Sequence, residues 1–390
     1  MKIGVITFWN SKDNYGQLLQ AWALQQWLKQ NGHSPYIIRY IPTTHKSKKT
    51  YKYFLKVIAK TILIYPLFCK YINSKRDKKL KVLVANNEIK NQKRKFDDFR
   101  KDNLSFSPHT YYSLKELQNN PPLADVYITG SDQVWAQLLN NENNRAYFLD
   151  FGEQNIKRIS YAPSFSMLQY PTRLQNQLSN NLTRFNAISV REKSGVEICR
   201  TVGYDAALVC DPTLLLTQKD YLKLISPKSD EKKYIYIYSL NIQKAEDIRW
   251  TELSKLSKTS NLDVKVTTAS GYVPFQELFG NEVEYDYATI QQWLANIQNA
   301  ELVVTPSFHG IVFSILLHTP FIYVPLFGNF QKGNNRVTDL LEILHLNDRI
   351  LDQNKTYTQI INKAINWDDV EKRLLRMKQN SELFLQTELV

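Results

Sequence analysis

The sequence predicts an α/β fold with two Rossmann-like domains that face a cleft. At 390 residues the chain exceeds what one hydrophobic core usually organises, so we expect two domains of about 100 to 200 residues each. Short strand patterns alternate with helical patterns along the chain, an order typical of parallel sheets covered by helices. Hydrophobic residues make up 43% of the chain and charged residues 22%, which favours a folded globular protein.

The first unit of this pattern is a strand, a loop, a helix and a second strand. Residues 2–8 form an apolar run, and residues 17–31 repeat apolar side chains at helical spacing. Gly32 ends this helix, and residues 36–40 are predicted as the next strand. Because ligands in such folds bind beyond the carboxyl ends of the strands, the loop of residues 10–17 is a predicted ligand position.

Later segments repeat the alternation and suggest domain boundaries. We expect a first domain at residues 1–213, a second at 214–366, and a long helix at 367–390 that returns across the first domain. The predicted strands are 126–129, 157–161, 187–190, 207–210, 234–238, 264–267, 302–305 and 321–324, and the predicted helices are 174–181, 194–201, 290–299, 309–317 and 335–344.

The net charge of +13 is concentrated in one segment. Residues 46–101 contain 18 Lys and Arg against 4 Asp and Glu, which leaves the rest of the chain close to neutral. Within this segment, Lys52, Lys56 and Lys60 lie among apolar residues in a basic amphipathic pattern. The pattern indicates one attached basic insertion rather than a nucleic-acid-binding face spread over the fold.

Two interpretations of the basic insertion remain open. It is either a helix packed on its own domain with a solvated lysine face, or a stretch at 52–81 that binds an anionic membrane surface. The uncharged run at 61–69 is far shorter than the roughly 20 residues of a spanning helix. No nucleic-acid-binding motif accompanies the charge, so we expect no nucleic-acid partner.

The cysteines and the N-terminus indicate a location. Cys69, Cys199 and Cys210 have neither a disulfide framework nor metal-ligand spacing, which is typical of a reducing compartment. Residues 1–8 do not resemble a signal peptide. We expect a cytoplasmic protein, with the basic insertion as a candidate for peripheral attachment to the inner face of the cell membrane.

Three strand-to-helix junctions carry candidate site residues. Backbone N–H groups after Ser307 attract anions, and His309 is a candidate acid or base, although a lone His at such a turn is more often a structural hydrogen-bonding residue. Arg191 is a candidate clamp for a carboxylate or phosphate, or the partner of a neighbouring acid. Gly130 allows a ligand to approach the backbone, and Asp132 is a candidate proton acceptor or helix cap.

Short motifs follow one another along the chain. They are Asp13-Asn14-Tyr15-Gly16, Gly130-Ser131-Asp132-Gln133-Val134-Trp135, Ile159-Ser160-Tyr161-Ala162, Ser189-Val190-Arg191-Glu192, Asp211-Pro212-Thr213, Ser307-Phe308-His309-Gly310 and Asn335-Arg336-Val337-Thr338-Asp339-Leu340. Each motif is weak alone, but their order along nearly the whole chain outside the basic insertion is specific. Taken together, these motifs resemble the polysaccharide pyruvyl transferase family.

The resemblance implies an enzyme that moves the enolpyruvyl group of phosphoenolpyruvate onto a sugar diol, with release of phosphate and formation of a pyruvate ketal. It implies that His309 is the acid and that Arg191 binds phosphoenolpyruvate. Some relatives carry Arg-Leu-His where this chain has Ser307-Phe308-His309, and Arg336 is the candidate for the missing cation. The predicted catalytic residues are His309, Arg191 and Asp132, and the predicted phosphoenolpyruvate site is Arg191, Ser307, His309, Gly310 and Arg336.

The acceptor is expected to be a galactose-type sugar that forms a 4,6-ketal, on a lipid-linked oligosaccharide or glycan of surface polysaccharide synthesis. No cofactor is expected beyond phosphoenolpyruvate as donor substrate, and no metal site is expected because no acidic cluster or His pair has ligand spacing. The predicted acceptor-binding residues are Asp13, Asn14, Gly16, Gln17, Gly130, Ser131 and Trp135.

Two rival functions follow from the same features. A B-type glycosyltransferase would have a similar pair of domains and cleft, but would use a nucleotide sugar as donor. A non-catalytic membrane-binding or nucleic-acid-binding protein would depend on residues 46–101, whereas an enzyme should keep activity on soluble substrates without them.

Overall fold

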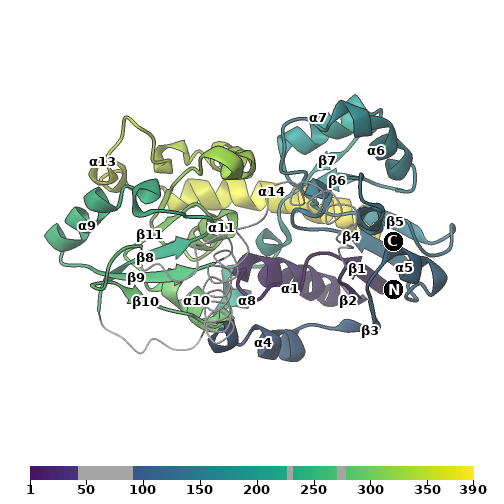
Figure 1. Cartoon of the computed structure of the whole chain (residues 1–390), viewed down its shortest axis with the longest axis horizontal. Helices are drawn as coiled ribbons and strands as arrows, with labels where there is room; N and C mark the ends of the chain where they lie inside the picture. Colours follow the sequence, from purple (N-terminus) through teal and green to yellow (C-terminus); the bar gives the residue numbers. More distant parts are fainter. Residues whose placement is uncertain (43–90, 226–231, 270–277) are drawn as a thin grey trace, which may run out of the picture.

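The computed structural model describes residues 1–42, 91–225, 232–269 and 278–390. Two five-stranded parallel sheets lie side by side, each covered by helices (Figure 1). Their strand orders are β3-β2-β1-β4-β5 and β10-β9-β8-β11-β12. This arrangement confirms the predicted α/β class with two Rossmann-like domains.

The first sheet is formed by apolar strands that pair in parallel. Its central strands are buried because helices cover both faces, and this explains their continuous apolar runs. The strands are β1 (Lys2–Ile6), β2 (Ser34–Tyr40), β3 (Phe106–Tyr111), β4 (Val126–Thr129) and β5 (Lys157–Ser160), and the helices around them are α1 (Tyr15–Gln30), α4 (Phe96–Asn103) and α5 (Leu114–Asn119).

A small two-stranded sheet extends the first domain. Strands β6 (Ser189–Val190) and β7 (Ala207–Leu208) pair in parallel, and the helices α6 (Gln175–Leu182) and α7 (Lys193–Thr201) pack beside them. The strand predicted at 187–190 is shorter than expected, because Ala187 makes only an isolated bridge to Ile159 of β5.

The second sheet repeats the parallel arrangement of the first. Strand β11 leads directly into α11, and β12 leads through a loop into α12. The strands are β8 (Tyr234–Ser239), β9 (Asp263–Thr268), β10 (Glu284–Tyr285), β11 (Leu302–Thr305) and β12 (Phe321–Tyr323), and the helices are α9 (Trp250–Thr259), α10 (Ile290–Gln298), α11 (Phe308–Leu316), α12 (Asn334–Ile343) and α13 (Tyr357–Ile361).

The N-terminus of α1 joins the two domains. The Tyr15 ring stacks on Trp293 of α10 at a centroid distance of 5.2 Å, and the Tyr15 hydroxyl donates a hydrogen bond of 2.7 Å to the carbonyl of Ala288. Arg94 donates a hydrogen bond of 2.6 Å to the same hydroxyl. These buried contacts fix the loop before α1 against the second domain.

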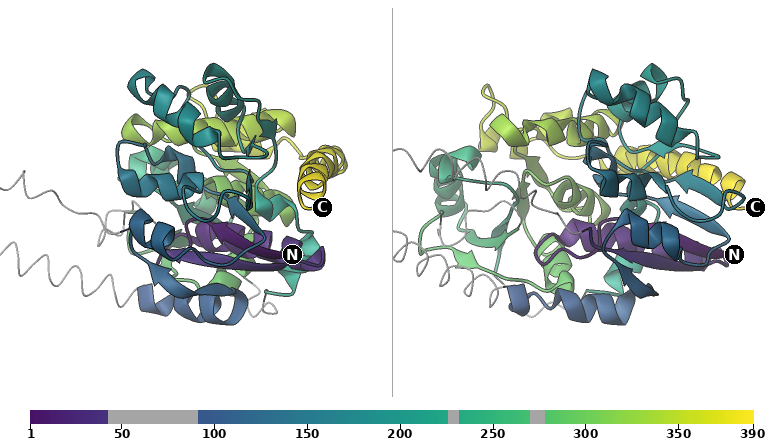
Figure 2. Two further views of the ribbon diagram at one scale, coloured as in Figure 1. Left: turned by 90° about the vertical axis from the view of Figure 1, so that its right-hand side faces the viewer. Right: turned by 45° about the vertical axis from the view of Figure 1, so that its right-hand side comes forward.

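The long helix α14 (Trp367–Glu388) contacts both domains (Figures 1 and 2). It begins beside the second domain, where Trp367 stacks on His318. Towards its end, Ser381 accepts a hydrogen bond of 2.8 Å from the backbone N–H of Cys210, and Glu388 pairs with Lys157 at 3.1 Å. Among the described segments, no helix is long and apolar enough to cross a membrane.

Most of the basic insertion, including Lys52, Lys56, Lys60 and the whole 52–81 stretch, lies outside the described residues. Its described end contacts the fold directly. Arg100 donates hydrogen bonds to the carbonyls of Trp9 and Ser11, at 3.3 and 2.7 Å, and so supports the loop before α1.

Candidate active site

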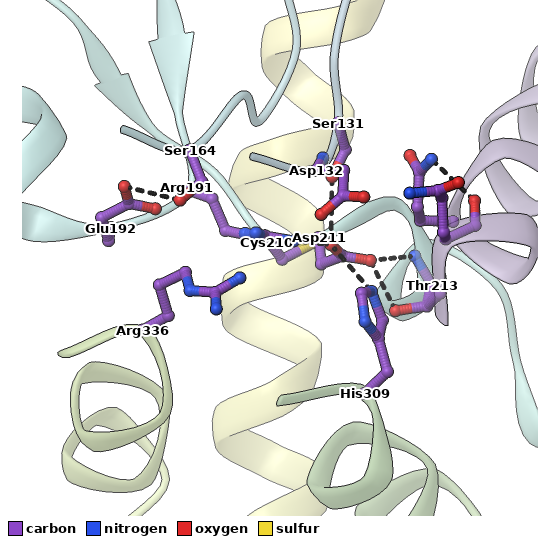
Figure 3. A network of polar contacts seen from close by, with 12 residues as sticks. Ser131, Asp132, Ser164, Arg191, Glu192, Cys210, Asp211, Thr213, His309 and Arg336 are labelled. Carbon is purple, nitrogen blue, oxygen red and sulfur yellow. Dashed lines mark hydrogen bonds and ion pairs between the residues drawn. The ribbon is translucent and has the colours of Figure 1, made fainter. Parts of the chain in front are cut away.

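Asp211 lies at the centre of a buried polar cluster between the two domains (Figure 3). It follows β7 and caps a short 3₁₀ helix, where its Oδ1 accepts hydrogen bonds from the backbone N–H and the hydroxyl of Thr213. Its Oδ2 accepts hydrogen bonds from Arg191 Nη1 at 2.6 Å and from the Ser131 hydroxyl at 3.0 Å. A carboxylate so fully bonded is held in one orientation.

Arg191 reaches this cluster from the junction of β6 and α7. Its guanidinium carbon lies 4.7 Å from the centre of the Phe308 ring, a cation–π arrangement across the domain boundary. Although burial lowers the pKa of Arg191, the charges of Asp211, Asp132 and Glu192 outweigh this effect and raise it. Its Nε and Nη2 are buried and have no hydrogen-bond partner within the described segments. The charged guanidinium therefore has two nitrogens available to donate hydrogen bonds to a ligand.

His309 lies in the first turn of α11, on the other side of Asp211. Its Nε2 is 3.6 Å from Asp211 Oδ2, and this buried atom has no hydrogen-bond partner within the described residues. A Cβ atom added to Gly16 would come within 2.1 Å of His309 Nδ1, so only a glycine fits at this point of α1. The first turns of α1 and α11 thus meet at the imidazole.

The ionisation of Asp211 follows from these contacts. Burial alone would raise the pKa of Asp211, but the nearby His309, the charge of Arg191 and the Thr213 hydrogen bond hold it well below its ordinary value. Asp211 is therefore an anion at neutral pH, and it stabilises the positive charge of Arg191.

Arg336 adds a second cation at the start of α12. Its guanidinium carbon is 5.9 Å from the centre of the Phe308 ring, so Phe308 lies close to two arginines. With the Gln133 amide oxygen facing it, Arg336 Nη2 donates a hydrogen bond of 2.8 Å to that oxygen. Burial, together with the charge of Arg191, lowers the pKa of Arg336 to about 10, and the side chain is charged at neutral pH.

The junction after β4 brings Asp132 beside Asp211 (Figure 3). The positive φ of Gly130, 110°, suits this turn, and a Cβ there would come within 2.2 Å of the Tyr161 carbonyl oxygen. Asp132 also has a positive φ, 70°, and its side chain is largely buried. The site therefore contains a second carboxylate, one that does not share the hydrogen bonds of Asp211.

The comparisons with known proteins identify the family of the chain. Residues 14–326 match the family model described as polysaccharide pyruvyl transferase. The chain belongs to the polysaccharide pyruvyl transferase family. No match was found among curated proteins.

Several solved structures are similar to this pyruvyl transferase family member over nearly its whole length. A UDP-GlcNAc 2-epimerase from Neisseria meningitidis bound to UDP-GlcNAc has 9% identity and a TM-score of 0.47, with 100% of each chain covered. MurG of Acinetobacter baumannii has 10% identity and a TM-score of 0.42, with 100% of this chain and 99% of that chain covered. UGT89C1 of Arabidopsis thaliana complexed with UDP-L-rhamnose has 12% identity and a TM-score of 0.49, with the same coverage.

The structure brings together only part of the predicted site of this pyruvyl transferase. Trp135 does not reach the cluster: it is 0% exposed, stacks on Phe148, and donates its indole N–H to the Tyr147 carbonyl. A side chain buried in this way has no surface left for a sugar, so we exclude Trp135 from the acceptor site. Ser307 caps α11, because its hydroxyl accepts a hydrogen bond of 3.2 Å from the N–H of Gly310.

The loop before α1 lies near the imidazole but uses its polar atoms internally. Asn14 caps α1 by accepting a hydrogen bond of 3.2 Å from the Gln17 N–H, and Gln17 accepts one of 2.9 Å from the Ser11 N–H. Asp13 is bonded to the Ser11 hydroxyl at 3.2 Å. These residues of the pyruvyl transferase shape the loop, and Gly16 is the one that touches His309.

Sequence reasoning missed Asp211, Phe308 and Gln133 as site residues. Asp211 had a usable signal, because it follows a predicted strand and belongs to the Asp211-Pro212-Thr213 motif. The contacts of Phe308 and Gln133 depend on how the two domains meet, which no local pattern reveals. Among the residues that the structure describes, no group of three or more His, Cys, Asp or Glu could hold a metal ion.

Proposed function

We propose that this protein transfers the enolpyruvyl group of phosphoenolpyruvate to a sugar diol and forms a cyclic ketal with release of phosphate. One observation carries the proposal. A buried carboxylate, Asp211, contacts both an arginine with two unpaired charged donors and the imidazole of His309. Such a cluster supplies both an anion clamp and a proton donor, the two elements that this donor requires.

The donor's two anionic groups match the two arginines. The unpaired Nε and Nη2 of Arg191 suit the planar geometry of a carboxylate or two oxygens of a phosphate. Arg336 provides a second positive charge on the other domain. Binding an anion between them offsets the burial of both cations.

In the first step, protonated His309 gives its proton to C3 of phosphoenolpyruvate, and the methylene becomes a methyl group. One sugar hydroxyl forms a bond to C2 as its proton passes to Asp132. The positive charge that develops at C2 is stabilised by the Asp132 carboxylate.

In the second step, the bond between C2 and the phosphate oxygen breaks, and its electron pair leaves with the phosphate. The second sugar hydroxyl then bonds to C2 and closes the ketal. Its proton restores His309, while the proton held by Asp132 passes to the departing phosphate. The protons balance without a further reactant. One hydroxyl proton replaces the proton that His309 gave to C3, and the other protonates the departing phosphate.

Asp211 acts in this scheme through His309 rather than on the substrate. It stabilises the imidazolium from the Nε2 side, as the buried aspartate does in other carboxylate–histidine pairs. The other ring nitrogen, Nδ1, lies beside Gly16 and is the candidate for proton transfer.

The acceptor side of the proposal is the loop of Asp13, Asn14, Gly16 and Gln17, together with Gly130. Ser131 is fully buried and donates its hydroxyl to Asp211, so it is left out of the acceptor site as Trp135 is. A galactose-type sugar fits the family's chemistry through its 4- and 6-hydroxyls, on a lipid-linked or polysaccharide precursor at the inner face of the membrane. Attachment through residues 52–81 would be supported by binding to anionic liposomes that is lost on replacing Lys52, Lys56 and Lys60. Equal liposome binding by the wild type and by the variant without these three lysines would contradict membrane attachment through this stretch.

The test is phosphate release from phosphoenolpyruvate with a panel of galactose-containing acceptors. We expect acceptor-dependent release that falls by about 10²-fold or more in His309→Ala. His318→Ala is the matched control, because His318 lies just past the end of α11 and pairs with the exposed Glu371. Turnover of a nucleotide sugar in place of phosphoenolpyruvate would instead identify a B-type glycosyltransferase and overturn the proposal.

A further inference from the structure

A cavity of about 300 Å³ backs onto the Asp211 cluster and opens to solvent beside α14. Its floor is made of the buried Arg191, Asp211 and Phe308. Its mouth is made of exposed residues, among them Lys193 of α7 and Arg376 of α14. The cavity therefore leads from the surface to the guanidinium of Arg191.

The charges along this cavity are mainly positive. Arg336 lines the cavity, and so do Arg373 and Arg376 of α14, one turn apart, whereas Asp211 and Asp339 are its acidic lining residues. Lys193 is paired with Glu342 at 2.7 Å and Arg373 with Asp369 at 2.7 Å, so both side chains are held in place. Such a path attracts a small anion and directs it inward.

The walls between these charges are apolar. Val209, Leu214 and Leu340 line the cavity and are buried. Apolar walls lower the local dielectric constant, so an anion interacts more strongly with the arginines here than at an open surface. The volume is also enough for a small phosphorylated ligand.

We propose that this cavity binds the phosphate group of the donor and the inorganic phosphate that it releases, with Arg376 as a further phosphate-binding residue. The inference rests on the proposed function, and adds where the phosphate leaving group binds and which way it leaves the site. The phosphate leaves towards α14, and the sugar approaches from the α1 side.

The arrangement of residues around Asp211 is consistent with separate binding sites for the phosphate and the sugar, one on each side of this carboxylate. Arg336 and Arg191 lie on one side of Asp211, whereas Thr213 and α1 lie on the other (Figure 3). A hydroxyl that attacks C2 and a phosphate that leaves it cannot occupy the same space. Separate sides let the second hydroxyl close the ketal while phosphate is still held by the cations.

The experiment measures binding of inorganic phosphate by thermal shift, and then its inhibition of transfer. Arg376→Ala should weaken phosphate binding by roughly threefold to tenfold, the usual net loss for one hydrogen bond. Lys372→Ala is the matched control, because Lys372 is an exposed cation of the same helix that does not line the cavity. The KM for phosphoenolpyruvate and the phosphate inhibition constant should rise together in Arg376→Ala, with a smaller change in kcat.

Equal phosphate affinity in Arg376→Ala and Lys372→Ala would overturn this inference, even if pyruvyl transfer is normal. Farnesyl diphosphate that stabilises the protein where inorganic phosphate does not would also overturn it, in favour of a lipid-linked ligand. Phosphate binding that depends on Arg376, without transfer from phosphoenolpyruvate to any acceptor, would keep the anion site and contradict the proposed function instead.

Discussion

Two buried arginines of the first domain, Arg158 and Arg191, are almost equally exposed, at 6% and 7%, but are bonded in opposite ways. The guanidinium of Arg158 donates hydrogen bonds to backbone carbonyls from each of its three nitrogens. The acceptors are Leu149, Phe151, Gly152, Glu153 and Ile156, at distances from 2.7 to 3.2 Å.

Arg191 has one hydrogen-bonded protein partner within the described residues, Asp211, and two of its nitrogens are buried without any. Leaving a buried charged donor unpaired is costly, and native structures rarely do so without a reason. The comparison teaches that burial does not separate structural from functional arginines, whereas hydrogen-bond satisfaction does. Arg158 stabilises a loop, and Arg191 has donors available for a ligand.

The largest expected effect is the contrast between Arg191→Lys and Arg158→Lys. Lysine at 191 keeps a charge beside Asp211 but removes the planar pair of donors, so kcat/KM for phosphoenolpyruvate should fall by about 10²-fold. Lysine at 158 leaves several carbonyls unbonded, and the free energy of unfolding should fall by roughly 3 kcal/mol with little change in kcat/KM. Steady-state kinetics gives kcat/KM and urea unfolding gives the free energy of unfolding for both variants. An equal loss of stability in the two would contradict the distinction between a structural and a functional arginine.

Asp211→Asn tests the electrostatic part of the comparison. It removes the negative charge beside His309, so we expect kcat in steady-state assays to fall by roughly tenfold to a hundredfold. An unchanged kcat would assign Asp211 a purely structural role.

The charge of Asp211 also makes the free energy of unfolding depend on pH in a defined direction. The pKa of Asp211 in the folded protein lies well below the value of about 3.9 in the unfolded chain. Its charge therefore stabilises the fold above about pH 4, and this contribution is lost as the pH falls towards the folded pKa. Unfolding of the wild type should depend more steeply on pH below about pH 4 than unfolding of Asp211→Asn.

The smallest expected effect comes from the glycine beside the imidazole. Gly16→Ala places a methyl group against His309 Nδ1, so kcat should fall by about tenfold. Gly32→Ala is the control, because its Cβ meets no atom within 4 Å and its φ of +81° makes the change costly in stability by about 1 kcal/mol. A normal kcat in Gly16→Ala would show that the imidazole moves aside.

Much of the fold could be predicted because the buried strands are apolar throughout. The strands β1, β4, β8 and β11 all read as continuous apolar runs, and each is in the interior of its sheet. The edge strands β3 and β10 were missed. β3 contains Pro108 and is partly exposed, and β10 has two residues, so neither gives a clear pattern.

The site could be predicted only in part, for a similar reason. His309, Arg191 and Asp132 follow strands, and the carboxyl ends of parallel strands meet at one edge of a sheet. Whether a residue at such an edge faces the cleft or the core depends on tertiary packing. Trp135 and Asp132 are three residues apart in one motif, but the first lies in the core and the second beside Asp211.

The most direct test of the account is pyruvyl transfer in D₂O followed by mass spectrometry of the ketal. Proton donation to C3 by His309 predicts one deuterium in the methyl group of the product, and His309→Ala should form product at least about 10²-fold more slowly while unfolding normally. A ketal without deuterium, or a His309→Ala enzyme as fast as the wild type, would contradict the role of the cluster in this chemistry.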